Sequence, residues 1–452
     1  MREGQGDMAA FQVQHDPEAG AARLPVVVIV SLINMFFAAV LEYSLPLYFN
    51  ALEGFPKGMW ASLAAWVVAP WAFAPILAGL LARRFGERRV WGAAMLGQAA
   101  VPAVFAAIPQ PWIVAPAAFW YGFTNALVWI GGISLTQVVP ADKKGLANGL
   151  VMMSLGLGSF LGPLAGRAIL WHDQVSALIE QGVWQDVGLF LIDVIKPKSD
   201  PSLAGFHFIL WGLAGASALG AVMMWTWGQR PGRWQGERAQ QTWAETADDL
   251  KRLLVNPRFW ALVLSLCLFG GSLFQASNQF LRYRAEDVEL ISGAQDRGWI
   301  IVQELRVLMW IPGGLAVGLL AGRRAPGLAG VLMLACFALS AAGIGWASTS
   351  AGLFAAVAAF EFVRQFMRWS HAGYLSEHMP EDLRATAIGL AITVAGTAGT
   401  LFGFLTNGIL NPDAASFDSR VPFWLAAGLG LTGALGLLVF DRFVPIRREQ
   451  KS

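Results

Sequence analysis

One loop pattern occurs twice in this sequence, and the two copies lie 240 residues apart. The first copy reads P-A-D-K-K-G-L-A-N-G-L over residues 140–150, and the second reads P-E-D-L-R-A-T-A-I-G-L over residues 380–390. A second pair has nearly the same separation, because G-L-L-A-R-R begins at Gly79 and G-L-L-A-G-R-R begins at Gly318. Each copy joins the end of an apolar run to a short basic loop. The pattern therefore predicts two halves with the same order and orientation of elements, as in a large class of membrane transporters.

The composition indicates a membrane protein. Hydrophobic residues make up 56% of the 452 residues and charged residues only 14%, whereas soluble domains carry roughly 25% charge. A run of roughly 20 apolar residues is long enough to cross a bilayer. We expect twelve such runs, at residues 24–49, 58–82, 88–108, 111–137, 144–170, 204–228, 258–282, 297–321, 327–346, 350–375, 384–409 and 421–444. The sequence thus predicts an all-α membrane protein with twelve transmembrane helices.

Basic residues predict which loops face the cytoplasm. Lysine and arginine follow the second, fourth and eighth runs and the last run, whereas the short loops near residues 109 and 348 carry neither. We therefore expect both termini in the cytoplasm and the chain in the cell (inner) membrane. The predicted order is an N-terminal tail (1–23), a six-helix bundle (24–228), a cytoplasmic linker (229–257), a second six-helix bundle (258–444) and a C-terminal tail (445–452).

Two longer loops each contain a short segment with helical periodicity. The segment T-A-D-D-L-K-R-L-L in the linker is predicted to form a short amphipathic helix. The segment V-S-A-L-I-E-Q-G-V-W in the outer loop 171–203 repeats apolar positions at helical spacing. The outer loop is either a surface connector or a partial lid.

The loop after the second run resembles a family signature, G-x-x-x-D-R-x-G-R-[RK], of the major facilitator superfamily. The corresponding positions are Gly79, Arg83, Arg84, Gly86, Glu87 and Arg88. Arg83 stands where the family has aspartate, and Glu87 stands where it has a basic residue. The repeated segments 140–150 and 380–390 resemble the family's P-x-x-x-R-G-x-A-x-G pattern. The resemblance implies the major facilitator fold of two six-helix bundles, transport by alternating access, and a gating role for this loop.

The tenth run carries a stripe of charged and polar side chains. The stripe consists of Glu361, Arg364, Gln365, Arg368 and His371, which share one helical face. Charge in lipid costs about 2.5–3.5 kcal/mol per residue, so the stripe must face protein or water, and the family plan places it beside a central cavity. We interpret Arg364, Gln365 and Arg368 as solute-binding residues. The alternative is a salt-bridge cluster that ties helices together, and both roles can hold.

The repeat extends this prediction to the first half. Glu361 corresponds to Tyr121, and Gln365 corresponds to Asn125, so neutral groups would line the opposite wall. Amides of other runs complete the candidate solute-binding set, namely Asn34, Gln275, Asn278 and Gln279.

Three carboxylates are candidates for proton coupling. Low dielectric favours the protonated form of a carboxyl group, and Glu361 is the first candidate, followed by Glu304 and then Glu42. Arg306 points about 200° away from Glu304 around their helix, so we expect Arg306 to reach a neighbouring helix or the membrane interface.

The sequence contains no metal-ligand spacing, phosphate-binding glycine loop or nucleophile motif. We therefore expect no cofactor, no enzymatic activity and no nucleic-acid partner. The expected partners are a small-molecule solute, protons and the lipid bilayer, and the expected state is a monomer.

Three functions remain open. The leading hypothesis is proton-coupled uptake of a small polar organic solute, nucleoside- or sugar-like, since Glu304 and Glu361 with their neighbours resemble the nucleoside:proton symporter branch. The alternative is a proton-coupled exporter of lipophilic compounds, which the abundant tryptophans and the glycine-rich segment 156–166 favour. That segment resembles a motif of family antiporters, although small residues also serve helix packing. The third is a non-transporting membrane sensor or assembly factor.

Overall fold

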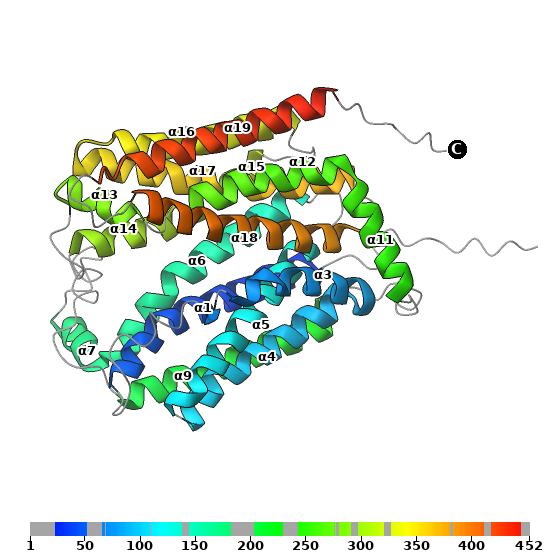
Figure 1. Ribbon diagram of the computed structural model, residues 1–452. Coiled ribbons are helices and arrows are strands. Elements are labelled where there is room, and N and C mark those ends of the chain that lie inside the picture. Colours follow the sequence, from blue (N-terminus) through cyan, green and yellow to red (C-terminus); the bar gives the residue numbers. More distant parts are fainter. Residues whose placement is uncertain are drawn as a thin grey trace, which may run out of the picture.

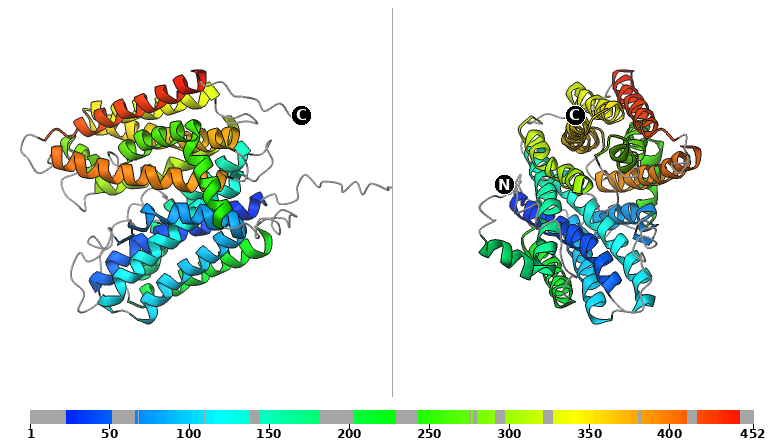
Figure 2. Two further views of the ribbon diagram at one scale, coloured as in Figure 1. Left: turned by 45° about the vertical axis from the view of Figure 1, so that its right-hand side comes forward. Right: turned by 90° about the vertical axis from the view of Figure 1, so that its left-hand side faces the viewer.

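Helices make up all of the secondary structure in the residues that the structure, a computed structural model, describes. The described residues are 23–51, 66–67, 69–108, 110–137, 144–181, 203–228, 243–274, 276, 280–290, 297–320, 327–379, 383–410 and 417–443. The helices form two six-helix bundles, with the first half of the chain below the second in Figure 1. Figure 2 (right) looks along the helices and shows the same two groups. The predicted fold class is confirmed.

The helices of the first bundle follow the predicted apolar runs closely. They are α1 (Leu24–Ala51), η1 (Ala69–Ala72) with α3 (Ala74–Phe85), α4 (Glu87–Ala107), α5 (Pro111–Gln137), α6 (Lys144–Leu170) and α9 (Leu203–Trp227). The backbone N–H of Arg23 donates to the carbonyl of Gly228 over 3.1 Å. The start of α1 and the end of α9 therefore meet at one end of the bundle, as an even number of crossings requires.

The second bundle has two interrupted helices. Its helices are α12 (Pro257–Leu266), η4 (Cys267–Phe274), α13 (Leu281–Asp287), α14 (Arg297–Leu308), α15 (Trp310–Leu320), α16 (Gly327–Trp346), α17 (Ser350–His378), α18 (Arg384–Leu410) and α19 (Val421–Phe443). The seventh predicted run continues from α12 into the π-helical η4. The eighth predicted run is divided at Met309 into α14 and α15. Seven of the described helices are long and apolar enough to cross a membrane, and three further apolar helices are shorter.

The amphipathic helix predicted in the linker is confirmed as α11 (Trp243–Val255). The outer loop contains α7 (His172–Glu180), which includes the first part of the segment with helical spacing. The last part of that segment, from residue 182, lies outside the described residues. Figure 1 shows the two helices at opposite ends of the molecule.

The two bundles touch at a pair of glycines that occupy equivalent positions in the repeated loop pattern. A Cβ built on Gly149 of α6 would lie 2.4 Å from the nitrogen of Gly318 and 2.6 Å from the carbonyl oxygen of Gly314. A Cβ built on Gly389 of α18 would lie 2.2 Å from the carbonyl oxygen of Pro75 in α3. Any side chain at either position would overlap the facing backbone. Both contacts lie near the starts of α6 and α18, at the end predicted to face the cytoplasm, so the bundles are closed against each other there.

Alanine at Gly149 or Gly389 is expected to weaken this closure. Overpacking a close contact costs about 1–3 kcal/mol, and about 1.4 kcal/mol changes a population ratio tenfold. Access to the space between the bundles from the cytoplasm should therefore increase by a factor of about 5 to 140. The measurement is labelling of a cysteine placed at Ile133, which faces that space, by an impermeant thiol reagent in inside-out vesicles.

The control for this experiment is Gly396→Ala in α18, because a Cβ at Gly396 meets no atom within 4 Å. Both native cysteines, Cys267 and Cys336, would first be replaced by serine. Equal labelling of the G149A, G389A and G396A proteins would show that the glycine contacts do not hold the cytoplasmic end closed.

Candidate functional site

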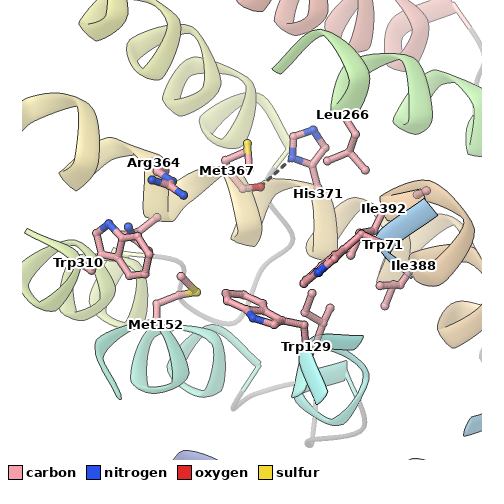
Figure 3. A pocket seen from close by; sticks show the side chains of 13 residues that line it. Trp71, Trp129, Met152, Leu266, Trp310, Arg364, Met367, His371, Ile388 and Ile392 are labelled. Atoms are coloured by element: carbon pink, nitrogen blue, oxygen red, sulfur yellow. Dashed lines mark hydrogen bonds between the residues drawn. The ribbon is translucent and has the colours of Figure 1, made fainter. Parts of the chain in front are cut away.

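A cavity of about 360 Å³ lies between the two bundles (Figure 3). Residues of both halves of the chain line it. They are Trp71, Trp129, Ile133, Met152, Leu266, Trp310, Arg364, Gln365, Met367, His371, Ile388, Ala391 and Ile392. Because the walls come from both bundles, relative movement of the bundles changes the shape and access of this cavity.

The walls of the cavity differ in chemistry. Figure 3 shows Trp71 and Trp129 next to each other on the side of the first bundle, with Met152 beside them. Arg364 and His371 of α17 lie on the opposite side. Among the described residues, the polar side chains of the lining apart from the indole nitrogens are a guanidinium, an amide and an imidazole, from Arg364, Gln365 and His371. In this described part of its lining, the cavity thus presents flat apolar rings and few hydrogen-bonding groups.

Behind Arg364 lies a buried ion cluster centred on Glu361, whose side chain is 0% exposed. One carboxylate oxygen accepts from Nε of Arg306 over 3.0 Å. The other accepts from Nη1 of Arg364 and from Nε1 of Trp310, each over 2.9 Å. The guanidinium of Arg364 also lies 5.0 Å from the centre of the Trp310 ring. We call Glu361, Arg306 and Arg364 the triad; it contains two positive charges and one negative charge.

The sequence offered two interpretations of the polar stripe in the tenth run, a solute-binding surface and a salt-bridge cluster, and the triad has features of both. Arg364 and Gln365 line the cavity as predicted, whereas Glu361 is fully enclosed by its donors and lies outside the lining. Arg306 reaches α17 from α14, so the prediction that it contacts a neighbouring helix is confirmed. The backbone of Arg368 lies in α17, and its side chain is outside what the structure describes.

Two further residues of the stripe are buried, but their hydrogen bonding differs. Nδ1 of His371 lies 2.8 Å from the carbonyl oxygen of Met367, and Nε2 lies 3.2 Å from the hydroxyl of Ser265. Since a carbonyl only accepts, Nδ1 carries a hydrogen and His371 is held at both nitrogens. Gln365 donates to the carbonyl of Glu361 over 3.1 Å. Its Oε1 is buried with no hydrogen-bond partner among the described residues, and such an atom calls for a solute or water.

A second ion pair joins the two bundles. Nη1 of Arg167 in α6 lies 3.1 Å from Oε1 of Glu304 in α14. Arg167 also donates to the hydroxyl of Tyr43 over 3.2 Å, with its guanidinium 4.9 Å from the Tyr43 ring. Oε2 of Glu304 is buried without a hydrogen-bond partner in the part of the chain that the structure describes. Along α6 this pair lies roughly 27 Å from Gly149, at a rise of 1.5 Å per residue, so it joins the bundles near the opposite end.

The remaining candidate residues of the first half lie apart from the cavity lining. The hydroxyl of Tyr121 donates to Oε1 of Glu42 over 3.0 Å. This hydrogen bond pairs a candidate solute-binding residue with a candidate proton-coupling residue. Asn34 and Asn125 are buried, and the Oδ1 of each has no hydrogen-bond partner among the described residues.

Three predicted amides, Gln275, Asn278 and Gln279, lie outside the described residues.

The predicted gating loop connects α3 to α4 at the closed end of the molecule. Gly79, Arg83 and Arg84 belong to α3, and Glu87 and Arg88 begin α4. Gly86 between the helices has φ 87°, a left-handed backbone that favours glycine, and its N–H donates to the carbonyl of Ala82 over 2.8 Å.

In this loop the guanidinium of Arg84 lies 5.6 Å from the ring of Phe85. The side chain of Arg83 is not among those described.

Sequence reasoning overlooked several residues of the site. Trp71, Trp129 and Trp310 lie in the middle of apolar runs, whereas tryptophan prefers the ends of membrane helices. Arg167 is an arginine inside an apolar run, so the energetic argument that identified Arg364 applies to it equally. These two departures from the usual membrane pattern were the available signals.

The family model described as the Major Facilitator Superfamily matches residues 27–404. The tetracycline resistance protein, class C, of Escherichia coli is 31% identical over 134 residues, which cover 29% of this chain and 34% of that protein. The probable nitrate transporter NarT of Staphylococcus carnosus is 40% identical over 86 residues, which cover 18% of this chain and 22% of that protein. The chain thus matches about a third of one relative and about a fifth of the other.

Solved structures with the same fold cover nearly the whole chain. FucP in the outward conformation has a TM-score of 0.69 at 14% identity, over 93% of this chain and 98% of that one. The human organic anion transporter MFSD10 has a TM-score of 0.66 at 14% identity, over 92% and 98%. The proton:xylose symporter XylE has a TM-score of 0.60 at 16% identity, over 93% and 95%. At these identities the likeness establishes the fold alone.

Proposed function

This chain belongs to the Major Facilitator Superfamily, and we propose that it is a secondary active transporter that carries a small organic solute, coupled to protons, through the cavity between its bundles. The observation that carries this proposal is a solute-sized cavity whose walls come from both bundles and which contains a positioned cation, Arg364. Closure by Gly149 and Gly389 at one end favours a cycle in which the two ends open in turn.

Coupling to protons needs a carboxylate whose charge controls an interaction between the bundles. Glu304 has that position, because its ion pair with Arg167 joins α14 to α6. A proton on Oε2 would neutralise Glu304, so that the ion pair becomes a hydrogen bond from the charged Arg167 to a neutral carboxylic acid, and the link between the bundles would weaken. Proton binding at Glu304 would thereby be linked to opening of this end.

This geometry favours Glu304 over Glu361 as the coupling carboxylate. Both oxygens of Glu361 already accept hydrogen bonds, from three donors in all. Glu42 accepts from Tyr121 within one bundle, so its protonation would leave the contact between the bundles unchanged. We therefore propose Glu304 first, and we assign Glu361 to holding Arg306 and Arg364 in place.

The cavity lining favours a solute with a flat ring over a sugar. A sugar presents hydroxyl groups on all sides, and each hydroxyl loses its hydrogen bonds to water when the sugar enters the site. This loss costs free energy unless polar groups of the site replace those hydrogen bonds. In the part of the chain that the structure describes, the lining offers three indole rings and three other polar side chains. A nucleobase-like ring system, within the range that the sequence predicted, fits these walls better, since aromatic rings stack favourably on one another.

Export of lipophilic compounds is the second candidate function. The apolar lining of the cavity and the similarity of 134 residues to a tetracycline resistance protein favour it. Both functions use the same cavity, and they differ in the direction of transport relative to the proton.

Membrane vesicles test the proposal and separate the two candidates. Right-side-out and inside-out vesicles, with and without the protein, would be given a mixed pool of metabolites under an imposed pH gradient, and their contents analysed by mass spectrometry. We expect at least one organic solute to accumulate in right-side-out vesicles with an acidic exterior, and a protonophore to abolish the accumulation. Accumulation only in inside-out vesicles with an acidic interior would favour export. If no solute moves in either type, the transport function is wrong.

A further inference from the structure

Resting on the proposed transport function, we propose that the solute is a planar organic anion. Its ring system lies against the indoles of Trp129 and Trp71, and its anionic group binds the guanidinium of Arg364. The inference concerns substrate class, and it follows from two features of the cavity: a fixed cation and an aromatic wall opposite it.

Arg364 is a cation held in one place at the surface of the cavity. Its side chain is 17% exposed and lines the cavity. Glu361 anchors the guanidinium over 2.9 Å, and the ring of Trp310 supports it at 5.0 Å. A guanidinium has five N–H donors in a rigid plane, so it can bind Glu361 and an acceptor on a solute together. Planar bidentate binding of a carboxylate is the interaction that arginine suits best.

The charge of Arg364 favours an anion over a neutral or cationic solute. Arg364 and Arg306 both bind the carboxylate of Glu361, and the three side chains are 17%, 13% and 0% exposed. At such depth water screens a charge poorly. A solute anion would therefore be attracted to the guanidinium of Arg364, whereas a cation would be repelled by it. Symport of a monovalent anion with one proton would also move no net charge across the membrane.

The opposite wall defines the shape of the solute. Trp71 and Trp129 lie next to each other, across the cavity from Arg364, with Met152 beside them (Figure 3). Indole rings and a methionine sulfur both contact aromatic rings favourably. Gln365, which is buried next to Arg364, has an unpartnered Oε1 among the described residues. That oxygen would accept from a hydroxyl or N–H group next to the anionic group of the solute.

Binding of three matched probes to the purified wild-type protein in lipid nanodiscs tests this inference. The probes are 1-naphthoate, which has a planar ring and a charge, 1-naphthamide, which has the ring without the charge, and cyclohexanecarboxylate, which has the charge without a planar ring. Calorimetric titration should give 1-naphthoate a Kd at least tenfold lower than either of the others. Equal affinity for 1-naphthoate and 1-naphthamide would overturn the proposal without any variant.

Two variants of the triad assign the preference to Arg364. Arg364→Gln should remove the difference between 1-naphthoate and 1-naphthamide. Arg306→Gln takes the other guanidinium from Glu361 but lies outside the cavity lining, so it should still bind 1-naphthoate more tightly than 1-naphthamide. Loss of the preference in both variants, or in neither, would contradict the assignment. If the R364Q protein does not fold, Arg364→Lys serves instead, with a preference reduced about tenfold because lysine cannot bind in a bidentate manner.

The binding test is independent of the vesicle experiment. Selective binding of 1-naphthoate without uptake of any solute would leave the anion site standing and remove the transport function. Proton-driven uptake of neutral or cationic solutes alone, with no selective binding of 1-naphthoate, would support the transport function and overturn the anion site.

Discussion

Glu304→Gln is expected to leave exchange of the solute across a membrane near the wild-type rate and to abolish accumulation driven by protons. Glutamine has the shape of a protonated glutamate, and its carbonyl can still accept from Arg167, but it cannot release a proton. One pH unit supports about tenfold accumulation when one proton accompanies each solute and no net charge moves. In the E304Q protein the accumulation ratio should fall to about one. The measurement is counterflow and gradient-driven uptake in proteoliposomes, with the solute identified in vesicles.

Two other carboxylates provide the comparison. Glu42→Gln changes a hydrogen bond within the first bundle, so the E42Q protein should keep its accumulation. If the E304Q protein accumulates solute at the wild-type level while the E361Q protein does not, the coupling carboxylate is Glu361, as the sequence first indicated. If all three proteins accumulate solute, none of these carboxylates is the coupling group, and another titratable residue must carry the proton.

Glu361→Ala is expected to reduce the free energy of unfolding by about 3–5 kcal/mol, the usual effect of removing one partner from a buried ion pair. The change leaves Arg306 and Arg364 together without the carboxylate that joins them, at 13% and 17% exposure. Reversible denaturation in mixed micelles would measure the loss. The matched control is Glu286→Ala, which removes a pair with Arg282 whose side chains are 40% and 44% exposed and which should cost at most about 1 kcal/mol.

Replacing the whole triad separates lost charge balance from lost packing. The variant with Glu361→Leu, Arg306→Met and Arg364→Met should regain most of the stability, because hydrophobic residues often replace a buried ion cluster without loss. Its binding of 1-naphthoate should nevertheless be absent. If Glu361→Ala costs no more than Glu286→Ala, the triad is accessible to water and the charge argument for an anionic solute fails.

The sequence by itself determined the membrane helices and the repeat. The predicted runs 111–137 and 144–170 coincide with α5 and α6, because the length of an apolar run and the solvation of its ends are local properties. The 240-residue repeat also related Gly149 to Gly389 before their contacts were known, since two copies of one unit pack in equivalent ways. The stripe of Arg364 and Gln365 was found for a local reason too, because charge inside an apolar run is costly wherever the helix packs.

The tertiary structure alone decided which charges meet. Glu361 is separated in sequence from Arg306 by 55 positions, and Glu304 from Arg167 by 137. Helical periodicity shows which residues share a face, but it does not show which helix that face meets. The same limit hid the cavity wall of Trp71 and Trp129, since the apolar run around each ring does not show which helix the ring faces. Ion-pair partners, the cavity and buried oxygens without a hydrogen-bond partner all depend on packing between helices that are distant in sequence. For that reason only the folded chain could place them.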